Sequence, residues 1–287
     1  MQVTSAVHPA KLERIRAMVA DRIATRELTL PLLPQVASQV MALANDHQAD
    51  ASRLSSLIHQ DQALASQILR IANSPAYLPR SPIVTLQQAV AWLGMNMLAN
   101  LALTVSLQNG IFRIHAHQKE VKTLWRQALA TGLFAKEVAR HCRQNVESAY
   151  LCGLLHTIGK PVLLHTILDI QTSLDIELTW EDISTLLEWY HVSVGSQVAE
   201  AWHLPDYVRE AILYYQDYTQ APRASKIVLI THFADCLATH LLSPEHFTED
   251  HLFSLPVLEE LNFYAEDVSR VLAQRESLEK LIETMAI

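Results

Sequence analysis

Glycine, cysteine and basic residues are scarce in this sequence of 287 residues, and each scarcity excludes a class of protein. The six glycines fall in no Gly-x-Gly-x-x-Gly, Walker or Gly-x-Ser-x-Gly pattern, so the common phosphate loops and the nucleophile elbow are absent. Cys142, Cys152 and Cys236 share no Cys-x-x-Cys spacing, which argues against a disulfide scaffold or zinc ribbon and indicates a reducing compartment. A formal net charge of -8 at pH 7 argues against a nucleic-acid groove, which needs a basic face.

Long apolar runs are missing as well. The most apolar stretch, residues 95–107, is too short to span a bilayer and contains Asn96 and Asn100. The N-terminal segment has apolar residues at helical spacing, but charged residues interrupt it, so it is no signal peptide. We therefore expect a soluble, cytoplasmic protein with neither a membrane nor a nucleic acid as its partner.

What the sequence does contain is apolar residues at the 3.6-residue period of helices, together with helix caps. Thr85 with Gln88, and Thr179 with Asp182, have the spacing of capping boxes. Ser193 is a further candidate cap, for a separate helix running to Trp202. No segment alternates convincingly as a strand, and no repeat has a fixed period. The pattern predicts an all-α fold.

One predicted helix carries the most informative residues. Asn145 can cap it, apolar residues crowd all its faces, and a histidine, His156, stands near its end. Gly159 suits a helix stop, Pro161 follows it, and Lys160 is interpreted as complementing the dipole at the helix end. This helix is expected to be central and buried.

The end of this helix, Leu154-Leu155-His156-Thr157-Ile158-Gly159-Lys160, resembles the signature of the HD superfamily of metal-dependent phosphohydrolases. In that family an adjacent His-Asp pair binds metal. Here the pair is His156-Thr157, and a neutral threonine hydroxyl is a far poorer donor to a divalent cation than a carboxylate. The resemblance implies the fold, while the same residues argue against the chemistry.

A second resemblance, to the HD-related output domain (HDOD) family, rests on several signatures in that family's order and spacing. They are Leu30-Pro31-Leu32-Leu33-Pro34, Ile58-His59-Gln60-Asp61-Gln62-Ala63-Leu64, Leu69-Arg70-Ile71-Ala72-Asn73-Ser74 and Ala89-Val90-Ala91-Trp92-Leu93-Gly94. The resemblance implies a two-lobed helical fold with an HD-like helical bundle. We expect an N-terminal helix at 1–27, an N-terminal subdomain at 28–113, an HD-like subdomain at 114–220, and a C-terminal helical extension at 221–287 that completes the bundle. The passage between the lobes is expected at residues 112–118.

The same resemblance identifies what remains of an HD pocket, called here the HD-like site. Gln127 stands where the family has its first histidine, and Asp235 is a plausible closing aspartate. Tyr215 replaces one of the family's paired histidines, and His191 is a possible extra ligand. The expected members of the HD-like site are Gln127, His156, Thr157, Lys160, His191, Tyr215 and Asp235.

Too few ligands remain in this set for metal catalysis. A stable divalent site wants at least three good protein ligands, and the core set retains two, His156 and Asp235. We therefore expect no catalytic residue and no cofactor, with weak divalent metal binding possible at those two residues. The simplest interpretation of His156 is a buried histidine hydrogen-bonded to Asp235.

Three functions stay open on the sequence. The family's usual role implies a non-enzymatic protein of bacterial signal transduction that acts through contacts with signalling proteins, often alongside cyclic-di-nucleotide pathways. The first alternative is a residual metal-dependent phosphohydrolase or phosphodiesterase. The second is a receptor that binds a small ligand such as a nucleotide in the HD-like site.

Overall fold

The computed structural model describes residues 4–33, 35–44, 50–75, 77–222 and 225–285, and every regular element in those ranges is helical. This confirms the all-α prediction. The helices are α1 (Thr4–Ala24), α2 (Gln35–Ala44), α3 (Ala51–Ile58), α4 (Gln62–Ala72), α5 (Leu86–Leu93), α6 (Met95–Asn109), α7 (Gln118–His141), α8 (Val146–Leu155), α9 (Gly159–Leu174), α10 (Trp180–Ala201), α11 (Asp206–Tyr214), the 3-10 helix η1 (Tyr218–Gln220), α12 (Lys226–Leu242), α13 (Glu249–Phe253), α14 (Val257–Leu261), α15 (Ala265–Leu272) and α16 (Arg275–Met285).

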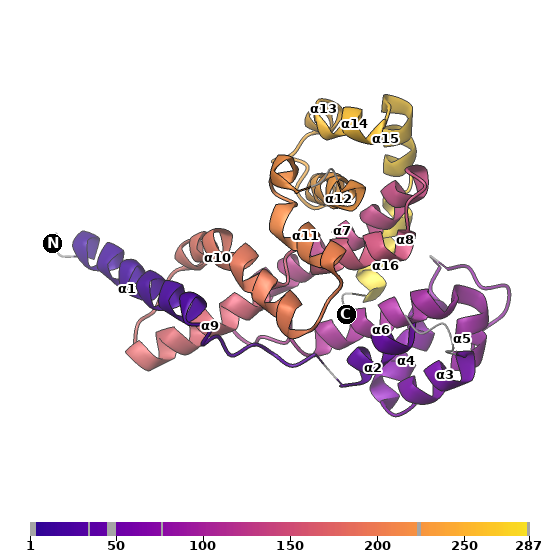
Figure 1. The fold of residues 1–287 in the computed structure, drawn as a ribbon, viewed down its shortest axis with the longest axis horizontal. Helices are drawn as coiled ribbons and strands as arrows, with labels where there is room; N and C mark the ends of the chain where they lie inside the picture. Colours follow the sequence, from indigo (N-terminus) through magenta and orange to yellow (C-terminus); the bar gives the residue numbers. More distant parts are fainter. Residues whose placement is uncertain (1–3, 34, 45–49, 76, 223–224, 286–287) are drawn as a thin grey trace.

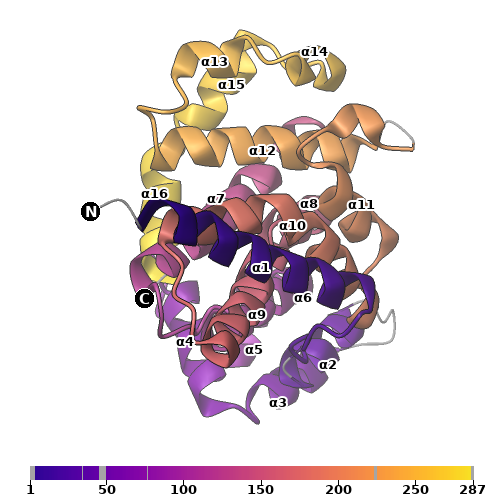
Figure 2. The same cartoon turned by 90° about the vertical axis from the view of Figure 1, so that its left-hand side faces the viewer.

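The helices form three groups (Figure 1). Helices α2–α6 lie together at one end, α7–α12 form the central bundle, and α13–α15 lie beyond α12 at the opposite end. Helix α1 lies across α10 (Figure 2), where Gln197 Nε2 donates to the Ile23 carbonyl at 2.9 Å. The indole of Trp202 donates to the Pro31 carbonyl at 2.8 Å, which fixes the chain that leads from α1 to α2.

Helices α7 and α8 form the centre of the bundle because both carry small residues where they cross. A Cβ on Gly153 would lie 2.7 Å from the Thr131 carbonyl oxygen, so only glycine permits this approach of the two backbones. Helix α8 is buried along its length from Ala149 to Leu155. Its cap is the predicted one, since Asn145 accepts hydrogen bonds from the Glu147 and Ser148 amides.

Helices α9 and α10 correct two predictions. Gly159 does not stop a helix: α8 ends at Leu155, and Gly159 begins α9, where a Cβ would overlap the His191 carbonyl oxygen and lie 2.6 Å from the Gly195 nitrogen. Its role is therefore close packing against α10. Ser193 caps no helix, because α10 continues unbroken past it from the Thr179 capping box to Ala201.

The two lobes meet through side chains of α6 and α8. Asn100 Nδ2 donates to Glu147 Oε2 at 2.7 Å, and the hydroxyls of Thr104 and Tyr150 are hydrogen-bonded at 2.8 Å in the buried interface. The non-helical connection between α6 and α7 lies between Asn109 and Gln118, where the passage between the lobes is predicted. The exact subdomain boundaries stay a prediction.

One stretch of the described chain, Val146–Leu174, is long and apolar enough to cross a membrane, and α5 with α6 would qualify as a second if they were not bent by 117°. Within the first stretch 83% of the apolar window is buried inside the protein. Such burial is the behaviour of core helices in a soluble protein.

Candidate functional site

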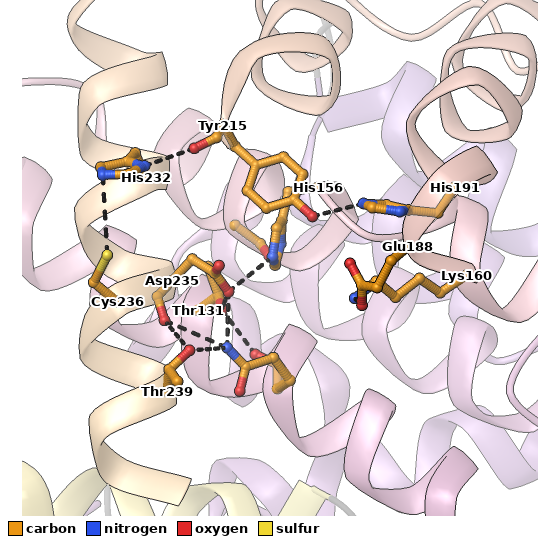
Figure 3. A network of polar contacts seen from close by, with 12 residues as sticks. Thr131, His156, Lys160, Glu188, His191, Tyr215, His232, Asp235, Cys236 and Thr239 are labelled. Atoms are coloured by element: carbon orange, nitrogen blue, oxygen red, sulfur yellow. Dashed lines mark hydrogen bonds and ion pairs between the residues drawn. The ribbon is translucent and has the colours of Figure 1, made fainter. Parts of the chain in front are cut away.

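Asp235, on α12, is the centre of the HD-like site. Its Oδ1 atom accepts hydrogen bonds from Gln127 Nε2 at 2.7 Å, from His156 Nε2 at 3.1 Å and from the Thr131 hydroxyl at 3.3 Å (Figure 3). Three helices therefore converge on one carboxylate oxygen: α7 supplies the amide and the hydroxyl, and the end of α8 supplies the imidazole. The predicted contact between His156 and Asp235 is present.

His156 is fully buried and has an acceptor at each ring nitrogen. Nδ1 lies 2.6 Å from the Gly153 carbonyl oxygen, and Nε2 faces the Asp235 carboxylate. A carbonyl and a carboxylate only accept hydrogen bonds, so both contacts are hydrogen bonds at once only in the form of the ring that carries a hydrogen on each nitrogen.

The charge state of Asp235 follows from its neighbours. Burial alone would raise the pKa of this carboxyl, but the charge of His156, the hydrogen bonds from His156 and Gln127, and the charge of Lys160 outweigh burial and lower the pKa to about 2. The carboxylate is therefore ionised throughout the physiological range.

Asp235→Asn should consequently cost stability in a pH-dependent way. A folded-state pKa of about 2 against a usual value of 3.8 means that the ionised carboxylate contributes about 2 kcal/mol, fully present above about pH 4 and lost as the pH falls towards 2. Urea unfolding of both proteins at neutral pH and through this acid window measures the difference. Equal pH dependence in the two proteins would show that Asp235 contributes nothing in its charged form.

A second hydrogen-bonded unit lies beside the first. His191 Nε2 accepts from the Tyr215 hydroxyl at 2.7 Å (Figure 3). His191 Nδ1 donates to the Leu187 carbonyl at 2.8 Å. Burial, followed by the nearby charge of Lys160, lowers the pKa of His191 to about 4, so this ring is neutral. The Tyr215 ring also stands edge-on to His156, with centroids 4.6 Å apart. Tyr215 thus joins the two histidines through one side chain.

Lys160 and Thr157 do not join the hydrogen bonds to Asp235. Lys160 lies in the first turn of α9 and donates to Glu188 Oε1 at 2.6 Å, which corrects the interpretation that it complements the end of a helix dipole. Thr157 is buried, with 7% of its surface exposed, but its hydroxyl makes none of the hydrogen bonds that connect the described members of the site.

Several members of the network were not predicted. Thr131 follows Gln127 by four residues on α7, and Thr239 follows Asp235 by four on α12, accepting from Gln127 Nε2 at 3.1 Å. The signal was available, because polar residues one helical turn from a site residue share its face. His232 donates from Nδ1 to the Tyr215 carbonyl at 2.7 Å and lies 4.0 Å from the Cys236 sulfur. Burial raises the pKa of Cys236 to about 12, so this thiol is no nucleophile.

The donor set does not fit a divalent metal. Gln127 presents an N–H to the carboxylate, both nitrogens of His156 are occupied, and His191 Nε2 is used by Tyr215. Within the described ranges no three residues of the types His, Cys, Asp or Glu are grouped so that they could hold a metal ion.

One family model matches more than half of the chain. The model of the HDOD domain matches residues 30–218. An uncharacterised protein of Treponema pallidum (strain Nichols) is 28% identical over 228 residues, which are 76% of this chain but 43% of that protein, so the chain spans less than half the length of that relative.

Solved structures show the same fold at low sequence identity. A candidate metal-dependent phosphohydrolase from Shewanella amazonensis SB2B has a TM-score of 0.75 at 18% identity, with 96% of this chain and 99% of that chain covered. An HDOD domain protein of unknown function from Geobacter sulfurreducens has a TM-score of 0.70 at 21% identity, with 95% and 97% covered. A candidate signal transduction protein from Marinobacter aquaeolei VT8 has a TM-score of 0.67 at 22% identity, with 100% and 68% covered.

Proposed function

Because the chain belongs to the HDOD domain family, we propose that it is a regulatory protein of bacterial signal transduction that acts through protein contacts and turns over no substrate. Its proposed partners are other signalling proteins. Because the family often works alongside cyclic-di-nucleotide pathways, those pathways are one context to test. The proposal has two parts. The first is that the HD-like site is not catalytic, and the second is that the helical fold acts by contacting other proteins.

The observation that carries the first part is the hydrogen bond from Gln127 to Asp235. The amide nitrogen lies 2.7 Å from Oδ1, so the side chain at the first ligand position donates a hydrogen where a metal ligand would offer a lone pair. The Thr131 hydroxyl donates to the same oxygen, and His156 Nε2 approaches it as well. Three side chains therefore already occupy this carboxylate oxygen, and a metal would have to displace them.

This arrangement also explains how the fold is kept without a metal. A buried polar group left without its partner typically costs about 1–3 kcal/mol. Fully buried His156 and Asp235, whose side chain is 27% exposed, satisfy each other in this way between α8 and α12. A structural role for the HD-like site is thus sufficient to account for its residues.

Purified protein should accordingly contain less than about 0.1 equivalents of manganese, iron or zinc, and should not hydrolyse a cyclic dinucleotide or bis-p-nitrophenyl phosphate when these metals are added. Metal analysis and a discontinuous product assay measure the two quantities. Stoichiometric metal together with turnover that is lost in Asp235→Asn would contradict the proposal and favour the residual phosphohydrolase.

A further inference from the structure

A groove of about 570 Å³ lies between α13, α14 and the start of α15, in the layer of helices beyond α12 (Figures 1 and 2). Phe253, Leu258, Phe263 and Tyr264 supply much of its apolar surface. Tyr264 is 72% exposed and Phe253 is 37% exposed, whereas Leu258 and Phe263 are buried. The groove thus combines a buried apolar floor with two aromatic side chains that reach the solvent, as protein-binding surfaces do.

The floor of this groove is fixed before any partner binds. The Phe263 ring contacts Phe233 of α12, with centroids 5.4 Å apart, and His141 of α7, with centroids 5.6 Å apart. The turn between α14 and α15 is closed by a hydrogen bond from the Phe263 amide to the Leu258 carbonyl at 2.8 Å. A surface that is already formed loses little conformational entropy when a partner binds to it.

The charges on the helices that form the groove have one sign. Residues 248–267 contain no lysine or arginine but six carboxylates, which are Glu249, Asp250, Glu259, Glu260, Glu266 and Asp267. Glu266 and Asp267 pair with Arg270. The other four are exposed and take part in no ion pair within the described part of the chain, and Glu259 lines the groove itself. Such a surface attracts a cationic partner and repels an acidic one.

The same charges decide between a second copy of this chain and a different protein. A two-fold dimer formed through the groove would place identical surfaces against each other, so the carboxylates of one copy would face those of the other. The chain as a whole is also acidic, with a formal net charge of -8. The charge pattern therefore favours a basic partner of another kind.

We propose that this groove binds a basic segment of a partner protein. A few apolar side chains of that segment pack between Phe253 and Tyr264, and flanking lysine or arginine side chains face Glu259 and Glu260. The inference rests on the proposed function and deepens it, because it names the surface and the kind of partner through which the protein acts. The two fail separately, since metal content and turnover test the HD-like site and leave the groove untested.

Selection of phage-displayed random dodecapeptides on the full chain tests the proposal. We expect the enriched peptides to be positively charged and to contain leucine or aromatic residues, and a synthetic one to bind with a Kd below about 100 μM by fluorescence anisotropy. Tyr264→Ala should weaken this binding about tenfold, because it removes an exposed aromatic side chain from the groove. Urea unfolding checks that the variant is folded.

A charge reversal distinguishes the groove from general attraction to an acidic protein. Glu259→Lys combined with Glu260→Lys should weaken binding at least about tenfold, and should regain it with a peptide whose basic residues are replaced by glutamate. Glu276→Lys combined with Glu283→Lys is the matched control, because both residues are exposed on α16 and neither lines the groove. The proposal is overturned if no peptide is enriched, if the enriched peptides are neutral or acidic, if Tyr264→Ala binds as tightly as the wild type, or if the control weakens binding as much as the groove variant. Self-association that is lost in Tyr264→Ala would overturn it in favour of a second copy.

Discussion

The double variant Gln127→His, Thr157→Asp should bind manganese at least about 100-fold more tightly than the wild type. The change replaces a hydrogen-bond donor by an imidazole at a position that already lies 2.7 Å from Asp235 Oδ1, and places a carboxylate next to His156 in the chain. Together with His156 and Asp235 these residues supply four donors, and a stable divalent site needs at least three.

Isothermal titration of both proteins with manganese measures this gain. Gln127→Leu is the control that removes the amide hydrogen bond without adding a ligand, and it should leave manganese binding weak. Thr157→Asp alone should be destabilised, because it places an unpaired carboxylate at a residue that is 7% exposed. Tight stoichiometric binding by the wild type would contradict the conclusion that its own residues do not fit a divalent metal, and no gain in the double variant would show that the four side chains do not converge in a metal-binding geometry. Hydrolytic activity is not required of the double variant, since substrate contacts are a separate requirement.

Gly159→Ala should destabilise the protein by at least about 3 kcal/mol, the upper end of the usual cost of overpacking. A methyl group at this position overlaps the carbonyl oxygen of His191 and lies 2.6 Å from the backbone nitrogen of Gly195. Both obstacles are backbone atoms of α10, so α9 and α10 would have to separate. That movement would also disturb His191, and with it the hydrogen bond to Tyr215.

Gly94→Ala is the matched control for this substitution. Gly94 has a positive φ of 83° with ψ of 162°, a conformation essentially restricted to glycine, but a Cβ there meets no atom within 4 Å, so its cost is that of the backbone conformation alone, about 1–3 kcal/mol. Chemical unfolding of the two variants and the wild type gives the comparison. Equal destabilisation by the two substitutions would mean that the contact between α9 and α10 is looser than it is in this structure.

Local signals in the sequence predicted the helices and their caps well. The capping boxes at Thr85 and Thr179 are both present, because a cap is decided by residues three positions apart. The predictions for Gly159 and Ser193 are wrong for different reasons. Close packing of α9 on α10 requires a glycine at position 159, which begins α9, whereas Ser193 is exposed and α10 simply continues through it. Such a contact between distant segments leaves no local pattern.

In the HD-like site too, some contacts were predictable from the sequence and others were not. The pairing of His156 with Asp235 was predictable, because a buried histidine needs a partner and the family motif names one. How α7 and α12 cross decides which way the Gln127 amide points and which contacts Thr131 and Thr239 make. No local pattern in the sequence predicts that crossing.

The position of Asp235 in the chain also determines where the protein can be truncated. The match to the family ends at residue 218, whereas the carboxylate that His156 contacts is on α12, which begins at Lys226. A fragment cut at the family boundary would retain His156 and the Gln127 amide but lose the carboxylate that both contact, and would expose the face of α7 on which α12 packs. Helix α12 is therefore an integral part of the folding module and no dispensable appendage, so truncation experiments and domain fusions should place their junctions beyond it.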